Sequence, residues 1–186
     1  MTVHPTELRQ QQQEPTHPIP HGGSAHGPRG VPPQGRRFQT NTSAPFPGID
    51  ITGPPPFRDV GGEPVFVGSS VSPGSVHPCK LVPHLRPVCR VAYGGGELGH
   101  EGRYDILPIT QEHEWVPTSQ GRVPEGRRPV DGGYEESGHR LYHAVAVVHG
   151  CSVPGKTGAH LAGANVPYGG SEIVVREGYW ILCWRD

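Results

Sequence analysis

Glycine and proline interrupt this chain so often that long helices are excluded. Of 186 residues, 28 are glycine and 23 are proline, and the longest stretch without either runs from His139 to His149. An average globular helix needs about 11–12 residues, so a helical bundle, a coiled coil or a doubly wound α/β fold is not expected. The composition favours short strands joined by turns, in one or two small domains.

Charge and hydropathy exclude several classes of function. Sixteen basic and seventeen acidic residues give a net charge of -1, which argues against a nucleic-acid partner. No apolar stretch approaches the roughly 20 residues that span a bilayer, so we expect no membrane insertion by this chain alone. The N-terminal residues lack the apolar core of a secretory signal, which favours a cytoplasmic location, with nonclassical secretion as the alternative.

Residues 1–47 have the composition of a disordered tail. They combine a glutamine-rich stretch with repeated proline, glycine, serine and histidine, and their only aromatic residues are Phe38 and Phe46. Such a segment cannot bury enough apolar surface to offset its chain entropy. We therefore expect the folded part to begin near residue 48.

From residue 48 onward, short β-branched and aromatic runs alternate with Gly/Pro turns. All three tryptophans and all six tyrosines lie in this part. Short apolar runs bounded by turn signals predict an all-β, sandwich-like domain. The predicted strands lie within residues 63–71, 88–93, 103–107, 141–148, 171–175 and 178–184.

An internal repeat organises these strands. Three segments recur at an offset that changes by a single position along the chain: 62–66 with 138–142, 78–80 with 154–156, and 91–97 with 166–172. The repeat predicts two pseudo-symmetric β units, residues 48–110 and 111–186, packed as one domain. Because the stretch from Trp115 to Pro129 has no counterpart before residue 48, we expect the first unit to borrow a strand, with residues 178–184 as the candidate.

The repeat also duplicates a pair of opposite charges. Lys80 and Lys156 are equivalent, and an acid, Asp59 or Glu135, precedes each lysine by the same interval. A carboxylate accepts hydrogen bonds from adjacent hydroxyls and an ammonium donates to their oxygens, so such a pair can hold a vicinal diol. The alternative is an ion pair that only braces the fold, in a structural or interaction protein without sugar binding.

A literal P-loop match favours a different function. Gly150 to Thr157 reads GCSVPGKT, which fits GxxxxGK[ST] and follows an apolar run. A P-loop cradles phosphates at the start of a helix, but the glycines and the proline after Thr157 leave no room for one. A P-loop nucleotide-binding protein is therefore a remote alternative.

The second unit resembles the DM9 repeat, and the first resembles a more diverged copy. The motifs that carry the likeness are Trp115-Val-Pro, Pro154-Gly-Lys156 and Val166-Pro-Tyr168-Gly-Gly-Ser-Glu172. Characterised members imply a small tandem-repeat β lectin that tends to form a homodimer, binds mannose-type glycans and serves innate recognition. Because the sequence shows nothing like a nucleophile–base pair, paired catalytic carboxylates or a metal triad, no enzymatic activity is expected. The sugar contacts implied for this chain fall on Asp59, Lys80, Glu135 and Lys156.

Several further residues are secondary candidates. Glu136 and Asp131 could take over the acid's role, and Tyr134 could stack on a sugar ring. Glu97 and Glu172 follow the paired glycines and are expected to accept hydrogen bonds from turn amides. No metal site or cofactor is expected, and the four cysteines are expected to be free thiols, with a Cys79–Cys89 bridge left open.

Overall fold

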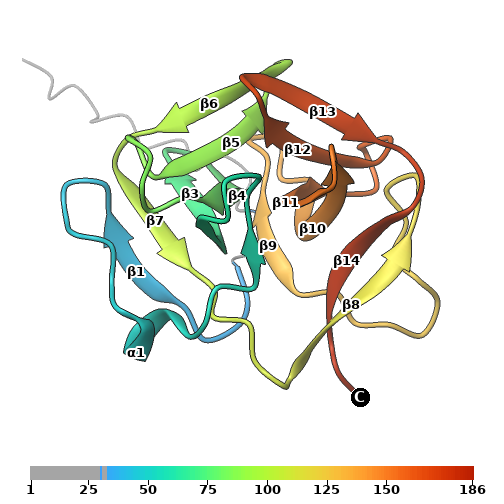
Figure 1. The fold of residues 1–186 in the computed structure, drawn as a ribbon. Helices are drawn as coiled ribbons and strands as arrows, with labels where there is room; N and C mark the ends of the chain where they lie inside the picture. The colour runs from blue at the N-terminus through green and yellow to red at the C-terminus, as the bar shows by residue number, and fades with distance from the viewer. Residues whose placement is uncertain (1–29, 31–32) are drawn as a thin grey trace, which may run out of the picture.

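A computed structural model describes residue 30 and residues 33–186 of the chain (Figure 1), and within this part the fold is almost entirely β. The helix α1 (Ile49–Thr52) is a single turn, and no helix in this part is long and apolar enough to cross a membrane. The strands are β1 (Phe38–Asn41), β2 (Phe57–Arg58), β3 (Pro64–Ser72), β4 (Ser75–Leu81), β5 (Cys89–Tyr93), β6 (Gly96–His100), β7 (Arg103–Ile106), β8 (His113–Thr118), β9 (Asp131–Tyr134), β10 (Arg140–Val148), β11 (Cys151–Thr157), β12 (Ala164–Tyr168), β13 (Ser171–Val175) and β14 (Tyr179–Trp184).

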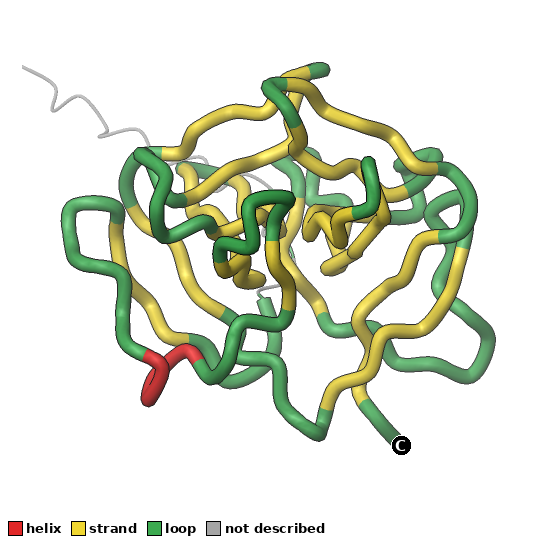
Figure 2. The backbone as a smooth tube through the Cα atoms, in the orientation of Figure 1, coloured by secondary structure: helices red, strands yellow, loops and turns green. Residues whose placement is uncertain are grey.

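The strand order confirms the internal repeat. The main path through the sheet runs β1-β7-β3-β4-β5-β6 and then β13-β12-β11-β10-β14-β8. Each strand of the first half has its repeat equivalent at the mirrored place in the second half. Figures 1 and 2 show the two units side by side, with β6 and β13 meeting where they join.

The first unit obtains its outer strand from a segment that composition assigned to the tail. Phe38–Asn41 pairs with β7, as β8 pairs with β14 in the second unit. The expectation of a tail through residue 47 is therefore wrong for residues 33–47, while residues 1–29, 31 and 32 lie outside the described part. The expected borrowing of residues 178–184 is also wrong, because β14 pairs with β10 and β8 of its own unit.

Each unit has its own apolar core. The central strands β3 and β10 are buried along most of their length, which explains why they read as continuous runs instead of alternating ones. A smaller cluster formed by Val67, Leu107, Val130 and Leu182 joins side chains of both units. The first core contains Phe66, Cys79, Leu81, Val88, Cys89, Val91, Tyr104 and Ile106; the second contains Ala144, Ala146, Val148, Val153, Ala164, Val166 and Tyr179.

Two equivalent hairpin turns clasp each other at the junction. Gly94–Gly95 and Gly169–Gly170 all have positive φ, between 60° and 86°, as a two-residue type I′ turn requires. The Glu97 carboxylate accepts the N–H of the second glycine in the opposite turn at 2.9 Å, and Glu172 does the same in return at 2.7 Å. The expectation that these glutamates bind turn amides is confirmed.

A buried polar network ties the N-terminal segment to both units. The Arg37 guanidinium lies 2.7 Å from the Asp105 carboxylate on β7 and donates to His143 Nε2 on β10 at 2.8 Å. Burial and the nearby Arg37 charge hold the pKa of His143 well below its usual range, so the ring is neutral and can accept this bond. Arg37 therefore connects a segment that precedes the repeats to a strand of each.

Candidate functional site

The second unit brings its predicted acid and lysine together. Glu135 lies in the turn between β9 and β10, where its N–H donates to the carbonyl of His139 at 2.9 Å. Lys156 lies on β11, directly opposite His143 of β10. Because β10 and β11 form one hairpin, the lysine returns to the turn that holds the acid, and its Nζ donates to Glu135 Oε1 at 3.3 Å.

The first unit completes this pair from across the junction. His77 of β4 accepts a hydrogen bond from Lys156 Nζ at Nδ1, at 3.2 Å, and its Nε2 lies 3.7 Å from Glu135 Oε2. The Lys156 ammonium also lies 5.1 Å from the ring centroid of Tyr93, in cation–π geometry. The site is therefore shared by both units.

A second imidazole approaches the acid from its own unit. His160, in the loop after β11, places Nε2 3.5 Å from Glu135 Oε1. We call Glu135, Lys156, His77 and His160 the Glu135 cluster. It offers carboxylate oxygens that accept hydrogen bonds beside nitrogen donors, which is the chemistry that holds a polyol.

Burial and charge fix the protonation states within the Glu135 cluster. Burial and the Lys156 charge lower the pKa of His77 to about 4, so this ring is neutral at pH 7. Burial raises the pKa of Glu135, but Lys156 and His77 outweigh it and leave that pKa below its ordinary value. The Lys156 side chain is only 4% exposed and that of Glu135 is 18% exposed, so a ligand meets the carboxylate first.

The first unit does not assemble the equivalent pair. Lys80 forms its ion pair with Glu97, at 2.8 Å, and donates to the carbonyl of Pro167 at 2.7 Å. Asp59 instead accepts the N–H groups of Gly61 and Glu63 at Oδ1, at 2.8 and 2.9 Å. The predicted Asp59–Lys80 pairing is therefore wrong, because the lysine reaches across the junction to the clasped turns.

What the repeat preserves is an acid–histidine pair. Asp59 Oδ2 lies 3.6 Å from His84 Nε2, just as Glu135 lies near His160. His84 and His160 are related by the same offset as the two lysines. The alignment thus contained this signal, which an interpretation based on charged residues alone missed.

The three secondary candidates, Tyr134, Glu136 and Asp131, lie in different environments. Tyr134 packs against the backbone of Gly30, where an added Cβ would meet its ring, and its role in stacking on a sugar stays a prediction. Glu136 is exposed and borders a pocket beside the Glu135 cluster. Asp131 is 4% exposed, and burial raises the pKa of its carboxyl.

The stretch that matches a P-loop is a strand. Residues Cys151–Thr157 form β11, paired along its length with β10, and the segment that follows leads into β12. A phosphate cradle requires a loop followed by a helix, so the nucleotide-binding alternative is wrong.

A pocket of about 300 Å³ adjoins the Glu135 cluster. It shares His77 with that cluster and is bordered by Tyr93, whose ring also faces Lys156. We call it the hydroxyl-lined pocket. Its lining comprises Ser70, Ser72, Ser75, His77, Val91, Tyr93, Leu98, Gly99, His100 and Glu136.

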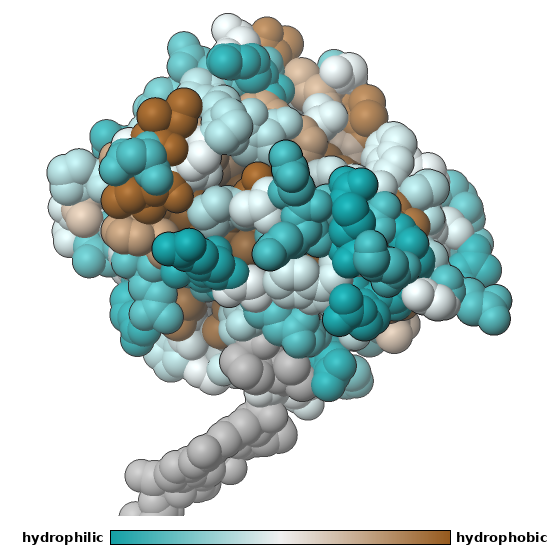
Figure 3. All heavy atoms as spheres, turned by 90° about the horizontal axis from the view of Figure 1, so that it is seen from below, coloured by the Kyte–Doolittle hydropathy of each residue, from teal (hydrophilic) through white to brown (hydrophobic). Residues whose placement is uncertain are grey.

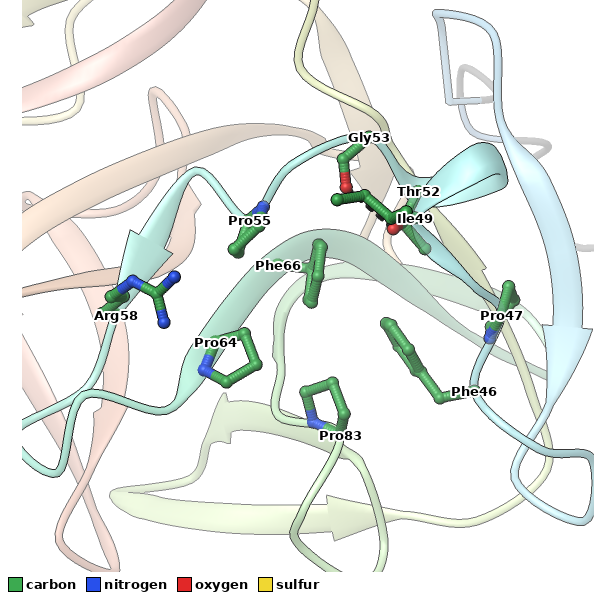
Figure 4. Close-up of a pocket in the computed structure, with 10 residues that line it drawn as sticks. All are labelled: Phe46, Pro47, Ile49, Thr52, Gly53, Pro55, Arg58, Pro64, Phe66 and Pro83. Carbon is green, nitrogen blue, oxygen red and sulfur yellow. Dashed lines mark hydrogen bonds between the residues drawn. The ribbon is translucent and has the colours of Figure 1, made fainter.

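An apolar pocket of similar size, about 310 Å³, lies on the first unit (Figure 4). Phe46, Phe66 and four prolines surround it, with Arg58 at one side, so it has few groups that could hold hydroxyls. Figure 3 shows the face seen from below, where hydrophobic residues gather at the left, on the side of α1, and hydrophilic ones across the centre and right. Compared with this apolar pocket, the hydroxyl-lined pocket and the Glu135 cluster offer more hydroxyl, imidazole and carboxylate groups.

The metal-ligating side chains of the described ranges form no group that could hold a metal ion. No three histidine, cysteine, aspartate or glutamate side chains there are grouped as a metal ion would require. The thiols of Cys79 and Cys89 lie 3.3 Å apart in the first core and are not bonded to each other, and Cys151 and Cys183 are also free.

Comparisons with known proteins agree with this fold. The model of the DM9 repeat family matches residues 59–175. A solved structure, the nematode sperm cell motility protein MFP2B, superposes with a TM-score of 0.59 at 18% sequence identity, covering 84% of this chain and 47% of that one. No curated protein matches the chain significantly. At this level of identity the structural likeness concerns the fold alone.

Proposed function

Because this chain belongs to the DM9 repeat family, we propose that it is a lectin-like module that binds mannose-type glycans at the Glu135 cluster. Membership of the family supports the general class, a carbohydrate-binding β module. The preference for mannose-type sugars and the role of the acid–lysine pair are the proposed parts. Binding proceeds without chemical change to the sugar.

One observation carries the proposal: a partly exposed carboxylate is surrounded by three nitrogen groups beside a pocket. Glu135 accepts from Lys156 at 3.3 Å, and His77 and His160 lie within 3.7 Å of its oxygens. Two adjacent sugar hydroxyls can donate to the carboxylate, while a ring nitrogen or the ammonium donates to a sugar oxygen. Charge-assisted bonds of this kind contribute about 1.5–3 kcal/mol each.

Glu135→Gln tests the role of the carboxylate. The amide has nearly the same shape but carries no charge, so we expect mannan retention to fall and the Kd for methyl α-mannoside to rise on the order of 10- to 100-fold. Titration calorimetry measures the Kd, and circular dichroism checks that the variant is folded. Unchanged affinity in folded Glu135→Gln, or no mannoside binding by the wild type, would contradict the proposal.

Asp59→Asn is the matched control, because Asp59 is the repeat equivalent of Glu135. Its carboxylate caps a turn and lies 3.6 Å from His84, whereas Lys80 pairs with Glu97. We expect this variant to retain the wild-type Kd within about twofold. An equal loss in both variants would mean that the acid–lysine pairing is not the determinant of binding.

A structural role is the second candidate, and the first-unit lysine favours it. Lys80 bridges Glu97 and Pro167, so it joins the two units instead of facing solvent. If Lys80→Met lowers the melting temperature and leaves mannan binding intact, this lysine braces the fold. If the wild type binds no glycan, bracing is the better account of Lys156 as well.

A further inference from the structure

We infer that the hydroxyl-lined pocket is a second sugar subsite, so that the ligand is an oligosaccharide of at least two neutral residues. The inference rests on the proposed function, because it takes the Glu135 cluster as the first subsite. The pocket and the cluster share His77, and Glu136 on the pocket wall directly follows Glu135. A glycan held at the cluster therefore has its next residue within reach of the pocket.

Tyr93 supplies a platform for that second residue. It is 49% exposed at the end of β5. The Lys156 ammonium lies over its ring, and the His77 ring meets it at 88° with centroids 5.5 Å apart, so the tyrosine is held in place. An exposed, fixed aromatic ring suits the flat apolar face of a pyranose.

The remaining lining selects neutral, hydroxylated ligands. Serine hydroxyls from β3 and β4 and the imidazole of His100 provide donors and acceptors. Among the described residues that line the pocket, Glu136 is the only one of the Asp, Glu, Lys and Arg types. Its negative charge disfavours uronic, sulfated or phosphorylated residues and favours a plain hexose.

The size of the pocket agrees with one sugar ring. A volume of about 300 Å³ is at the lower limit for small-molecule sites. The exposed Leu98 and the buried Val91 add apolar surface beside Tyr93. The pocket can therefore hold one hexose, while the Glu135 cluster holds its neighbour.

The test compares methyl α-mannoside with an α-linked mannobiose by titration calorimetry. For the wild type we expect the disaccharide to bind about tenfold tighter, which is the gain from one aromatic contact. Tyr93→Ala should remove most of this preference, and Tyr93→Phe should keep it because the ring remains. Glu125→Gln, at an exposed position on a separate loop, is the control and should behave as the wild type.

The outcomes separate the inference from the proposed function. Equal affinity of the wild type for both sugars, or a preference that persists in Tyr93→Ala, overturns the second subsite and leaves the first standing. Failure of the wild type to bind either sugar overturns the proposed function and the subsite with it. Tyr93 also contacts Lys156 of the first subsite, so a second variant, Glu136→Gln, tests the pocket separately. We expect this variant to bind a mannobiose with one anionic residue, which the wild type rejects. Continued rejection by Glu136→Gln would contradict the selectivity assigned to the pocket.

Discussion

His77 makes the stability of this protein sensitive to mild acid. Burial and the Lys156 charge lower its pKa to about 4 in the folded state, against about 6.5 when the chain is unfolded. Between these values the unfolded state binds a proton that the folded state does not, so the free energy of unfolding decreases as the pH falls. For one such histidine the loss is ~2 kcal/mol between pH 7.5 and pH 5, and ~3 kcal/mol by pH 4.

His77→Asn isolates this contribution. The asparagine amide can accept the hydrogen bond from Lys156 but does not titrate in this range. Other histidines with lowered pKa values, including His143, affect wild type and variant alike and cancel in the difference. The variant should therefore lose ~2 kcal/mol less than the wild type between pH 7.5 and pH 5.

Urea unfolding followed by tryptophan fluorescence at a series of pH values measures this difference. Measurements stop at pH 5 because Glu135, whose pKa is lowered, loses its own contribution at lower pH. His149→Asn, at an exposed position where asparagine suits the positive φ of 48°, should follow the wild-type curve. Parallel curves for wild type and His77→Asn would refute the reasoning.

Two further substitutions test the contacts that hold the fold together. Arg37→Met leaves the buried Asp105 carboxylate on β7 without its cation and should lower the free energy of unfolding by about 3–5 kcal/mol. The control, Arg36→Met at an exposed position, should change the free energy of unfolding by less than about 0.5 kcal/mol. Chemical denaturation measures both variants. Tyr179→Phe removes the hydroxyl that accepts the N–H of Gly121 at 2.9 Å and should lower the free energy of unfolding by about 1–3 kcal/mol. The equivalent Tyr104 hydroxyl is buried without a partner, so Tyr104→Phe should be neutral or stabilising, and equal losses in the two variants would contradict this assignment.

The apolar runs of the sequence predicted six of the fourteen strands of the described part, β3, β5, β7, β10, β13 and β14, and the repeat relates these to two of the others, β6 and β12. Equivalent strands follow the offset between the two copies, including β3 with β10 and β5 with β12. The sequence did not predict β1, because four residues, FQTN, show no clear alternation and lie among prolines and glycines. Their pairing with β7 depends on a tertiary contact that composition averaged over a long segment does not reveal.

The site was predicted only where its partners lie in one repeat. The spacing of Glu135 and Lys156 follows from a single hairpin and could be anticipated. The contributions of His77 to that pair, and of the Pro167 carbonyl to Lys80, cross the junction between units. A repeat alignment relates equivalent positions, but it does not indicate which positions of one unit face the other.

The two hairpin turns that clasp each other at the junction have a consequence for how the two repeats can diverge in sequence. Reciprocal contacts between equivalent residues are what an isologous dimer of single repeats would form. Here a covalent connection makes the same association intramolecular, so it does not depend on protein concentration. It also frees the two copies from having to remain identical: Lys80 pairs with Glu97, whereas the equivalent Lys156 pairs with Glu135.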